Sequence, residues 1–212
     1  MKLLIAIVAT IFFLLGFVAG RAKRRYEENI GEEAVKNLLN KHFANENYHL
    51  LNNITLPAIQ GTTQIDHILV STKGIFVIET KHYRGWIFGN PNHPKWTQVI
   101  FKLKNKFQNP LRQNYKHIKE LRRYFNFLPE DAFKSVIVFT GNCEFRTKMP
   151  DNVLMLKKLP FYICQYKQET ISLNRVFFVV GKLEFFRKEI SLKTDKEHIE
   201  YLRRKFGSKT TT

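Results

Sequence analysis

The sequence is poor in cysteine and in the motifs of several common enzyme classes. Its two cysteines, Cys143 and Cys164, belong to no Cys-x-x-Cys pair and no His–Cys cluster, so a zinc site is not expected. They are most simply two reduced thiols of a cytosolic domain, and a single disulfide is the alternative. The sequence also has no glycine-rich phosphate loop, no Ser-His-Asp set and no cysteine-nucleophile pattern. These absences exclude the usual signatures of nucleotide binding and covalent hydrolysis.

Acidic residues are scarce relative to basic ones. The 212 residues include 18 Asp and Glu against 35 Lys and Arg, which gives a net charge of +17. Such an excess favours a polyanionic partner, either nucleic acid or the anionic face of a membrane, although ordinary solubility is the simpler alternative. The hydrophobic content of 44% is sufficient for one domain with a sizeable core, or one domain plus a small appendage.

One long hydrophobic run stands at the N-terminus. Residues 3–20 contain no charged side chain and would rise about 27 Å as a helix, close to the thickness of a bilayer core. Lys2 precedes the run and basic residues follow it at positions 21 and 23–25, so we predict a single-pass cell-membrane anchor with the C-terminal domain in the cytoplasm. A cleaved signal peptide is the alternative, because residues 18–20 resemble a cleavage site. The anchor is favoured, since the basic cluster would resist translocation.

The patterning after residue 25 predicts a mixed sheet flanked by helices, which is an α/β fold. Helices are expected over 26–44, 111–126, Phe161–Gln168 and Asp195–Phe206, and strands over Tyr48–Thr55, Thr62–Ser71, Gly74–His82, Trp86–Phe88, Trp96–Phe101, Ser135–Thr140, Val153–Leu156 and Arg175–Val180. We divide the chain into the anchor with its basic stop (1–25), a domain (26–145) and a C-terminal extension (146–212) that packs on or extends the core.

Two very apolar strands carry charged residues. Asp66 lies in QIDHILV, and Glu79 and Lys81 lie in GIFVIETKH. Buried strands seldom contain charges unless these are paired or bind a metal. Two adjacent carboxylates repel each other unless a cation lies between them, and Mg²⁺ prefers oxygen ligands. Lys81 could stabilise negative charge on a phosphate or on an attacking water. The simpler interpretation is a buried ion pair between Lys81 and an acid.

The loop between these strands decides whether the two acids share a face. A loop with an even number of residues pairs Val70 with Ile75 and places Asp66 opposite Glu79. A loop with an odd number and a bulge at Gly74 places the acids on different faces. Both strands are apolar on both faces, so the pattern does not fix the register. A nuclease site, in which both acids would hold one metal ion beside a phosphodiester, requires the even arrangement.

Other polar residues have alternative interpretations. Glu32 falls on the apolar side of the first expected helix, three residues before Val35, whereas Glu33 falls on the polar side. At the start of the second long helix, the amides Gln113 and Asn114 could contact a phosphate or hold Lys81, or could face solvent. Near the acids, packing or hydrogen bonding is favoured over catalysis for His67 and His82.

Basic and aromatic residues gather between the strands and the second long helix, which is typical of a phosphate-tracking surface or of a solvated basic face. They are Lys95, Lys102, Lys104, Lys106, Arg112, Lys116, Lys119, Arg122 and Arg123, with Phe101, Phe107 and Tyr115. Directly after Lys81, the residues Tyr83, Arg84 and Trp86 could stack on or clamp a nucleic-acid strand. A half-buried aromatic pair is the alternative.

Four ordered segments resemble the NERD domain, a family grouped with the PD-(D/E)xK nuclease-like superfamily. They are GEEAV (31–35), TQIDHILV (63–70), GIFVIETKHYRG (74–85) and NPLRQNYKHIKEL (109–121). The resemblance covers roughly residues 26–141. It implies a restriction-endonuclease-like αβββαβ core and Mg²⁺-dependent nuclease activity, with Mn²⁺ as a substitute.

The resemblance also assigns roles to residues. It implies Asp66 and Glu79 as metal ligands, Lys81 as the catalytic lysine, and Glu32 and Gln113 as further catalytic residues. The main-chain carbonyl of Thr80 is an additional candidate metal ligand. No proline precedes Asp66, which departs from the wider superfamily pattern, since Ile65 stands there.

The sequence therefore predicts a membrane-anchored, Mg²⁺-dependent nuclease-like protein that hydrolyses phosphodiester bonds of DNA or RNA at the cytoplasmic face. The first alternative is a non-catalytic module that tethers nucleic acid or a partner to the membrane. A peripheral scaffold that binds anionic lipid is a second alternative, and it leaves the buried acids unexplained.

Overall fold

The computed structural model describes residues 26–59 and 61–187 as an α/β fold with mixed sheets. Residues 26–43 form the first helix. The later elements are β1 (Tyr48–Pro57), β2 (Thr62–Ser71), β3 (Gly74–His82), β4 (Gly85–Phe88), β5 (Lys95–Ile100), β6 (Leu103–Gln108), α2 (Pro110–Tyr124), η1 (Glu130–Ala132), β7 (Phe133–Thr140), β8 (Cys143–Phe145), β9 (Val153–Met155), η2 (Leu156–Lys158), α3 (Leu159–Cys164) and α4 (Leu173–Phe186).

Two predicted helices lie outside this part of the chain. They are the anchor over residues 3–20 and the terminal helix over Asp195–Phe206. Within residues 26–59 and 61–187, no helix is long and apolar enough to cross a membrane.

The larger sheet has the strand order β1-β2-β3-β7-β9. The β1–β2–β3 part is antiparallel, whereas β7 and β9 run parallel to β3. A parallel neighbour requires a crossover connection, and the chain between β3 and β7 supplies it with a small sheet and α2. The sheet is therefore mixed, as the sequence predicts.

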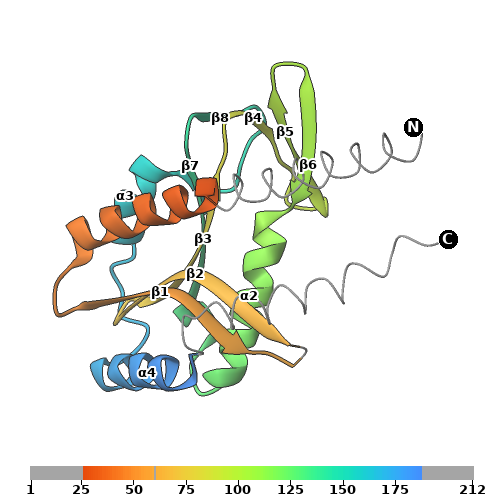
Figure 1. The fold of residues 1–212 in the computed structure, drawn as a ribbon. Helices are drawn as coiled ribbons and strands as arrows, with labels where there is room; N and C mark the ends of the chain where they lie inside the picture. The colour runs from red at the N-terminus through yellow and green to blue at the C-terminus, as the bar shows by residue number, and fades with distance from the viewer. Residues whose placement is uncertain (1–25, 60, 188–212) are drawn as a thin grey trace, which may run out of the picture.

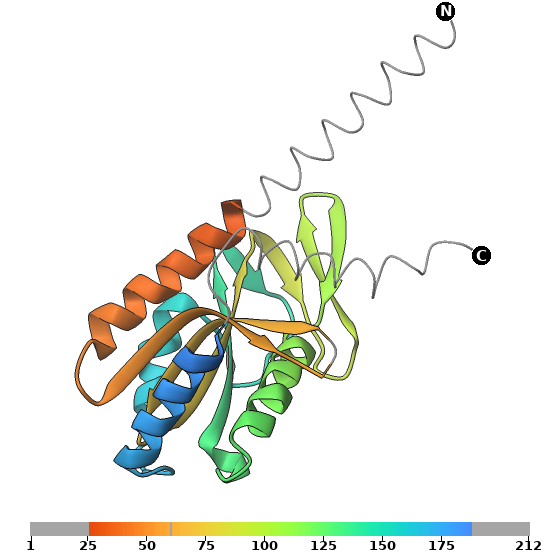
Figure 2. The same cartoon turned by 60° about the horizontal axis from the view of Figure 1, so that its bottom comes forward.

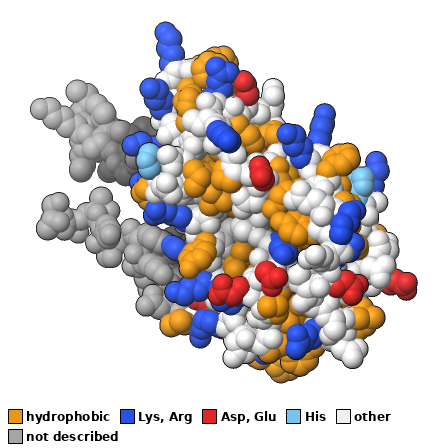
Figure 3. Space-filling model, turned by 180° about the vertical axis from the view of Figure 1, so that it is seen from behind, with side chains coloured by type: hydrophobic (Ala, Val, Ile, Leu, Met, Phe, Trp, Pro, Cys, Tyr) orange, Lys and Arg blue, Asp and Glu red, His pale blue; other side chains and the backbone are white. Residues whose placement is uncertain are grey.

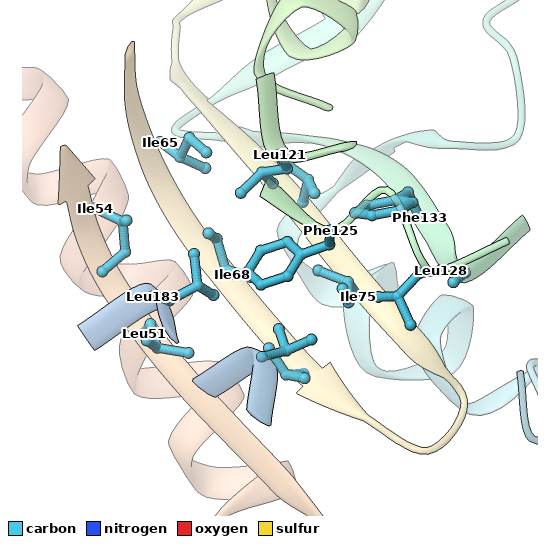
Figure 4. Packing of buried hydrophobic residues seen from close by; sticks show 14 of the residues in the cluster. Leu51, Ile54, Ile65, Ile68, Ile75, Leu121, Phe125, Leu128, Phe133 and Leu183 are labelled. Atoms are coloured by element: carbon cyan, nitrogen blue, oxygen red, sulfur yellow. The ribbon is translucent and has the colours of Figure 1, made fainter. Parts of the chain in front are cut away.

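Helices cover both faces of this sheet and form a three-layer arrangement (Figures 1 and 2). On one face, α2 and α4 pack on β1–β3 through residues such as Leu121, Phe125 and Leu183 (Figure 4). On the other face, the first helix and α3 pack through Val35 and Leu159, among others, onto β2, β3, β7 and β9. Because both faces are buried, the central strands are apolar on both sides.

The β2–β3 hairpin has the even register. Val70 pairs with Ile75 and Ser71 with Gly74, so Thr72 and Lys73 form the loop. Gly74 has a φ of +131°, and a Cβ atom there would lie 2.6 Å from the carbonyl oxygen of Ala132. This position therefore requires glycine for both conformation and space. The register that the nuclease interpretation requires is confirmed.

A second sheet, ordered β6-β5-β4-β8, packs beside β7. The ring of Trp96 in β5 stacks on Phe139 of β7 with centroids 6.3 Å apart and an interplanar angle of 8°. Sequence reasoning placed β4 and β5 approximately but missed β6 and β8. The strand β6 is mostly exposed and rich in lysine, and β8 has three residues, so neither shows a clear buried period.

The predicted strand Arg175–Val180 is wrong, because these residues belong to α4. The run VFFVV has the β-branched and aromatic composition of a strand. The buried residues of α4 are Val176, Val179 and Leu183. Their spacing of three and four residues places them on one face of a helix and does not fit the two-residue period of a strand. Strand propensity was therefore overridden by packing against β1 and β2.

Candidate active site

The candidate site lies where β2 and β3 separate. Their ladder ends at the pair His67–Ile78, one position before Asp66 would pair with Glu79. The side chain of Asp66 replaces the missing ladder contact, because its Oδ2 accepts a hydrogen bond of 2.7 Å from the amide of Thr80. Asp66 and Glu79 therefore lie at the same end of the hairpin.

The ammonium of Lys81 is held between β3 and α2. Its Nζ lies 2.5 Å from Oε1 of Glu79 and donates a hydrogen bond of 3.1 Å to Oε1 of Gln113. Gln113 is brought here by the start of α2, where the buried Asn109 accepts a hydrogen bond from the amide of Leu111 and caps the helix. The cap at the start of α2 thus positions a predicted site residue.

His117 is a site residue that sequence reasoning missed. Its Nε2 lies 3.3 Å from Oε2 of Glu79, within ion-pair distance but without hydrogen-bond geometry. Its Nδ1 lies 2.7 Å from Oγ1 of Thr63. His117 follows Gln113 by one helical turn and precedes the buried Leu121 by another. This i, i+4, i+8 stripe along α2 is the signal that could have found it.

Glu79 is a buried carboxylate that remains ionised. Burial alone would raise its pKa, but the ammonium of Lys81 and the neighbouring His117 outweigh this and lower the pKa to about 2. For Lys81, burial opposes the charged form, yet Glu79 and Asp66 raise its pKa above the ordinary value. Lys81 is therefore a cation at neutral pH and cannot act as a general base.

Asp66 and Glu32 have the opposite behaviour. Burial and then the carboxylates of Glu79 and Glu32 raise the pKa of Asp66 well above its ordinary value, against the effects of Lys81 and the Thr80 amide. Burial, Glu28 and Glu79 raise the pKa of Glu32 to about 7. Among the described residues, the neighbouring acids raise the pKa values of Asp66 and Glu32 by more than Lys81 lowers them. The site is therefore short of positive charge.

Glu32 reaches this region because the first helix lies very close to the sheet. A Cβ atom at Gly31 would lie 2.7 Å from Oγ1 of Thr140 and 2.8 Å from Cβ of His82. Only glycine allows this approach without a shift of the neighbours. Glu33 instead forms an exposed ion pair of 3.2 Å with Lys36, as its place on the polar side predicts.

The oxygen atoms at this site suit a small hard cation. Oε2 of Glu79 is buried and has no hydrogen-bond partner among the described residues, and the excess of negative charge calls for a positive ion. Within residues 26–59 and 61–187, however, no three His, Cys, Asp or Glu side chains form a ready-made metal cluster. A cation would therefore have two carboxylates and a main-chain carbonyl, a set that Mg²⁺ accepts because it retains several waters.

The remaining polar candidates near the site are structural. Asn114 is buried in α2 and donates to the carbonyl of Val77 at 2.8 Å and to Oγ of Ser135 at 2.9 Å. His67 contacts Oδ1 of Asn52 at 2.7 Å, and burial lowers its pKa to about 4, so it is neutral. His82 contacts Oγ1 of Thr140 at 3.0 Å. The packing and hydrogen-bonding interpretation holds for both histidines.

The residues after Lys81 divide into inward-facing and outward-facing groups. Tyr83 packs on Phe107, with ring centroids 4.6 Å apart, and Arg84 forms an ion pair of 2.9 Å with Glu27 of the first helix. Trp86 is 47% exposed. In Figure 3, hydrophobic and basic side chains lie side by side at the top of the molecule, where the β5–β6 hairpin lies. The basic residues predicted to form one surface lie on two elements. Lys95, Lys102, Lys104 and Lys106 belong to the β5–β6 hairpin, whereas the five others, at positions 112, 116, 119, 122 and 123, belong to α2.

The α/β fold with mixed sheets is consistent with a nuclease-like core. The nuclease-related domain (NERD) family matches residues 27–140, from the first helix to the end of β7, and the chain belongs to this family. An uncharacterized protein of Bacillus anthracis is 32% identical to it in an alignment of 211 residues that covers 95% of each chain. No solved structure matches the chain.

Proposed function

We propose that this protein is a membrane-anchored, Mg²⁺-dependent nuclease that hydrolyses phosphodiester bonds of DNA or RNA at the cytoplasmic face. The observation that carries the proposal is the position of Lys81. Its ammonium is fixed by Glu79 and Gln113. It lies beside Asp66, whose pKa is raised by burial and then by the carboxylates of Glu79 and Glu32. A charged lysine next to carboxylates that could hold a divalent cation would stabilise negative charge on a phosphate bound there.

Each side chain has a role that follows from its surroundings. Asp66 and Glu79, with the carbonyl of Thr80, would hold the cation. When bound, Mg²⁺ would neutralise charge on the phosphate and lower the pKa of a water molecule. Lys81 stabilises the charge that develops on the phosphate oxygens, and Gln113 keeps the ammonium in place. Glu32 has a pKa of about 7, which suits a group that orients the attacking water and accepts its proton near neutral pH.

Cleavage by the full chain in a neutral detergent tests this proposal. End-labelled DNA and RNA, single-stranded and duplex, would be incubated with Mg²⁺, Mn²⁺ or a chelator. Lys81→Met should lower the cleavage rate by about 10²- to 10³-fold, the range for loss of one positioned charge-stabilising group. The matched control is Lys158→Met, which removes an exposed lysine from the end of η2.

Two outcomes would contradict the nuclease proposal. One is equal cleavage by the wild type and Lys81→Met, which would indicate a contaminating enzyme. The other is metal-independent binding without any cleavage, which would favour the non-catalytic tethering module. That second candidate is supported by the close contact of Glu79 with Lys81 and by the lack of a three-residue metal cluster among the described residues.

The membrane anchor is a separate part of the proposal. It is supported by the uncharged run over residues 3–20 and the basic residues that follow it. The full chain should remain in the membrane fraction after extraction at high pH, with the mass of the unprocessed sequence. Loss of the first twenty residues from the expressed protein would contradict the anchor and favour a cleaved signal peptide.

A further inference from the structure

The register of the second sheet places aromatic and basic side chains on one face. Directly paired residues of antiparallel strands point to the same side. Trp86 of β4 pairs with Val99 of β5, which pairs with Lys104 of β6. In the next row, Phe88 pairs with Thr97, which pairs with Lys106. Each row thus runs from an exposed aromatic ring, through a small or β-branched residue, to an exposed lysine.

The opposite face of the same sheet is the packed one. Ile87, Trp96 and Phe107 alternate with the residues of these rows and contact Phe139 and its neighbours in the core. Burial of that face therefore explains the fold of this sheet. It does not explain why Trp86 and Phe88, which are 47% and 38% exposed, stand on the outer face.

We propose that this outer face, defined by Trp86, Phe88, Lys104 and Lys106, binds single-stranded nucleic acid and presents it to the candidate active site. The binding step stands independently of catalysis, whereas the delivery of the strand rests on the proposed function. The face differs from the acid–lysine site, since none of its four residues belongs to that site.

The geometry favours a single strand over a duplex. Trp86 and Phe88 are two residues apart on one strand, so their Cα atoms are separated by about 7 Å on a flat surface. Aromatic rings exposed on a sheet stack with unpaired bases, while lysines on neighbouring strands contact the phosphates. In a duplex the bases are already stacked on one another and present no free ring face, so the aromatic residues would add little.

The charges near the rings are compatible with this partner. The guanidinium of Arg146 lies 4.9 Å from the ring centroid of Trp86 and pairs with Glu144 at 2.9 Å. Glu144 is the acid paired with Trp86 across β4 and β8, and Arg146 offsets its charge. The remaining charged residues of the two rows are the lysines, which gives the face the sign that a polyanion requires.

The position of the face relative to the site supports delivery of the strand. Trp86 follows Lys81 by five residues, so their Cα atoms are at most about 18 Å apart. At the other edge, β6 ends at Gln108 and α2 begins at Pro110, three residues before Gln113. The connection from β3 to β4 therefore begins next to Lys81, and the connection from β6 to α2 leads to Gln113.

Fluorescence anisotropy of labelled oligonucleotides tests the binding step. The full chain in neutral detergent would be titrated, in the presence of a chelator, into a single strand and into the duplex of the same sequence. Trp86→Ala should weaken single-strand binding by about 5- to 100-fold, the range expected for loss of one stacked base, and should hardly change duplex binding. Trp86→Phe should restore most of the affinity because it retains a stacking ring.

Matched variants separate stacking from other effects. Phe161 of α3 is 78% exposed, and Phe161→Ala, which removes this ring, should leave both affinities unchanged. The double variant Lys104→Ala/Lys106→Ala should have a lower affinity for both the single strand and the duplex, and the salt dependence of its binding should be reduced. Lys81→Met should lower cleavage by about 10²- to 10³-fold and leave the preference for single strand over duplex unchanged, so failure of the nuclease proposal is distinguishable from failure of this one.

Three results would overturn the inference. The first is unchanged single-strand affinity in Trp86→Ala, and the second is an equal loss for single strand and duplex. The third is a loss confined to binding of mixed micelles that contain phosphatidylserine, which would assign the face to an anionic lipid surface.

Discussion

The two halves of the β2–β3 hairpin have opposite chemistry. Near the loop, Leu69, Val70, Ile75 and Phe76 are fully buried and pack against helices on both faces. At the far end, the same strands carry Asp66, Glu79 and Lys81. The near half contributes apolar burial to stability, whereas the far half holds charges that burial disfavours. One hairpin therefore both stabilises the fold and positions the candidate site.

The helix α2 is divided in the same way. Its second half places Leu121, followed by Phe125, on the apolar half of the sheet. Its first half places Gln113 and His117 beside Lys81 and Glu79. The hairpin and α2 are therefore each divided into a half that packs in the core and a half that carries site residues. The comparison predicts that substitutions near the loop alter stability and that substitutions at the far end alter mainly electrostatics and cleavage.

The largest effect is expected in the apolar half. Phe76→Ala should lower the free energy of unfolding by about 3–5 kcal/mol, because it leaves a cavity where a fully buried ring meets Tyr166. Chemical denaturation of the full chain in detergent measures this. Phe161→Ala, at an exposed ring, should change stability by less than about 0.5 kcal/mol. Cleavage per folded molecule should be unaffected. A loss of activity without a loss of stability in Phe76→Ala would contradict this division of the hairpin into a stabilising half and a site half.

A smaller effect is expected from the ion pair at the site. Lys81→Met leaves Glu79 buried without its cation and should cost about 3 kcal/mol of unfolding free energy at neutral pH. Adding Glu79→Gln should recover most of this loss, because the double variant buries no unpaired charge. The same denaturation experiment, applied to both single variants and the double variant, gives the coupling free energy between Lys81 and Glu79. Additive losses in the double variant would show that Lys81 stabilises the fold through contacts other than Glu79.

The smallest effect concerns pH. The pKa of Glu32 is about 7 in the folded protein against 4.5 ordinarily, so between these values the folded state binds more protons than the unfolded state. Stability should therefore fall as pH rises from 4.5 to 7. Glu32→Gln removes this loss and should be more stable than the wild type by about 1–2 kcal/mol at pH 8, with no advantage at pH 4.

Thermal unfolding across this pH range checks the Glu32 prediction. Glu33→Gln, at an exposed ion pair on the same helix, is the control and should show no such pH dependence. Mg²⁺ should narrow the difference between Glu32→Gln and the wild type, because a bound cation offsets the same repulsion. A stability difference that does not vary with pH would show that Glu32 is not coupled to the other acids.

Much of the fold could be predicted because its signals are local. The bounds of β2 and β3 agree with the predicted ranges, and the helix expected over 111–126 is found as α2 (Pro110–Tyr124). The failures occurred where local signals conflict or are weak. Strand-like composition concealed the helical period of α4, and β6 shows no buried alternation because its lysines face solvent.

The candidate site was predictable in its residue types and incomplete in its contacts. Charged residues in apolar strands are unusual enough to select Asp66, Glu79 and Lys81. His117 was missed, because a histidine on an amphipathic helix becomes informative only when its partner across the interface is known. The raised pKa of Glu32 likewise arises from acids on other elements.

The sequence by itself determined which residues carry charge into the core, the mixed character of the sheet and the family of the chain. These follow from composition, period and motif order, which are local properties. Only the tertiary structure decided the hairpin register, since strands that are apolar on both faces can pair in either register. The Thr72-Lys73 loop and the close fit of Gly74 against Ala132 select the observed one. The tertiary structure also decided that Glu32 and His117 act on the charges of the strand acids, because these interactions depend on how closely the two helical layers approach the sheet.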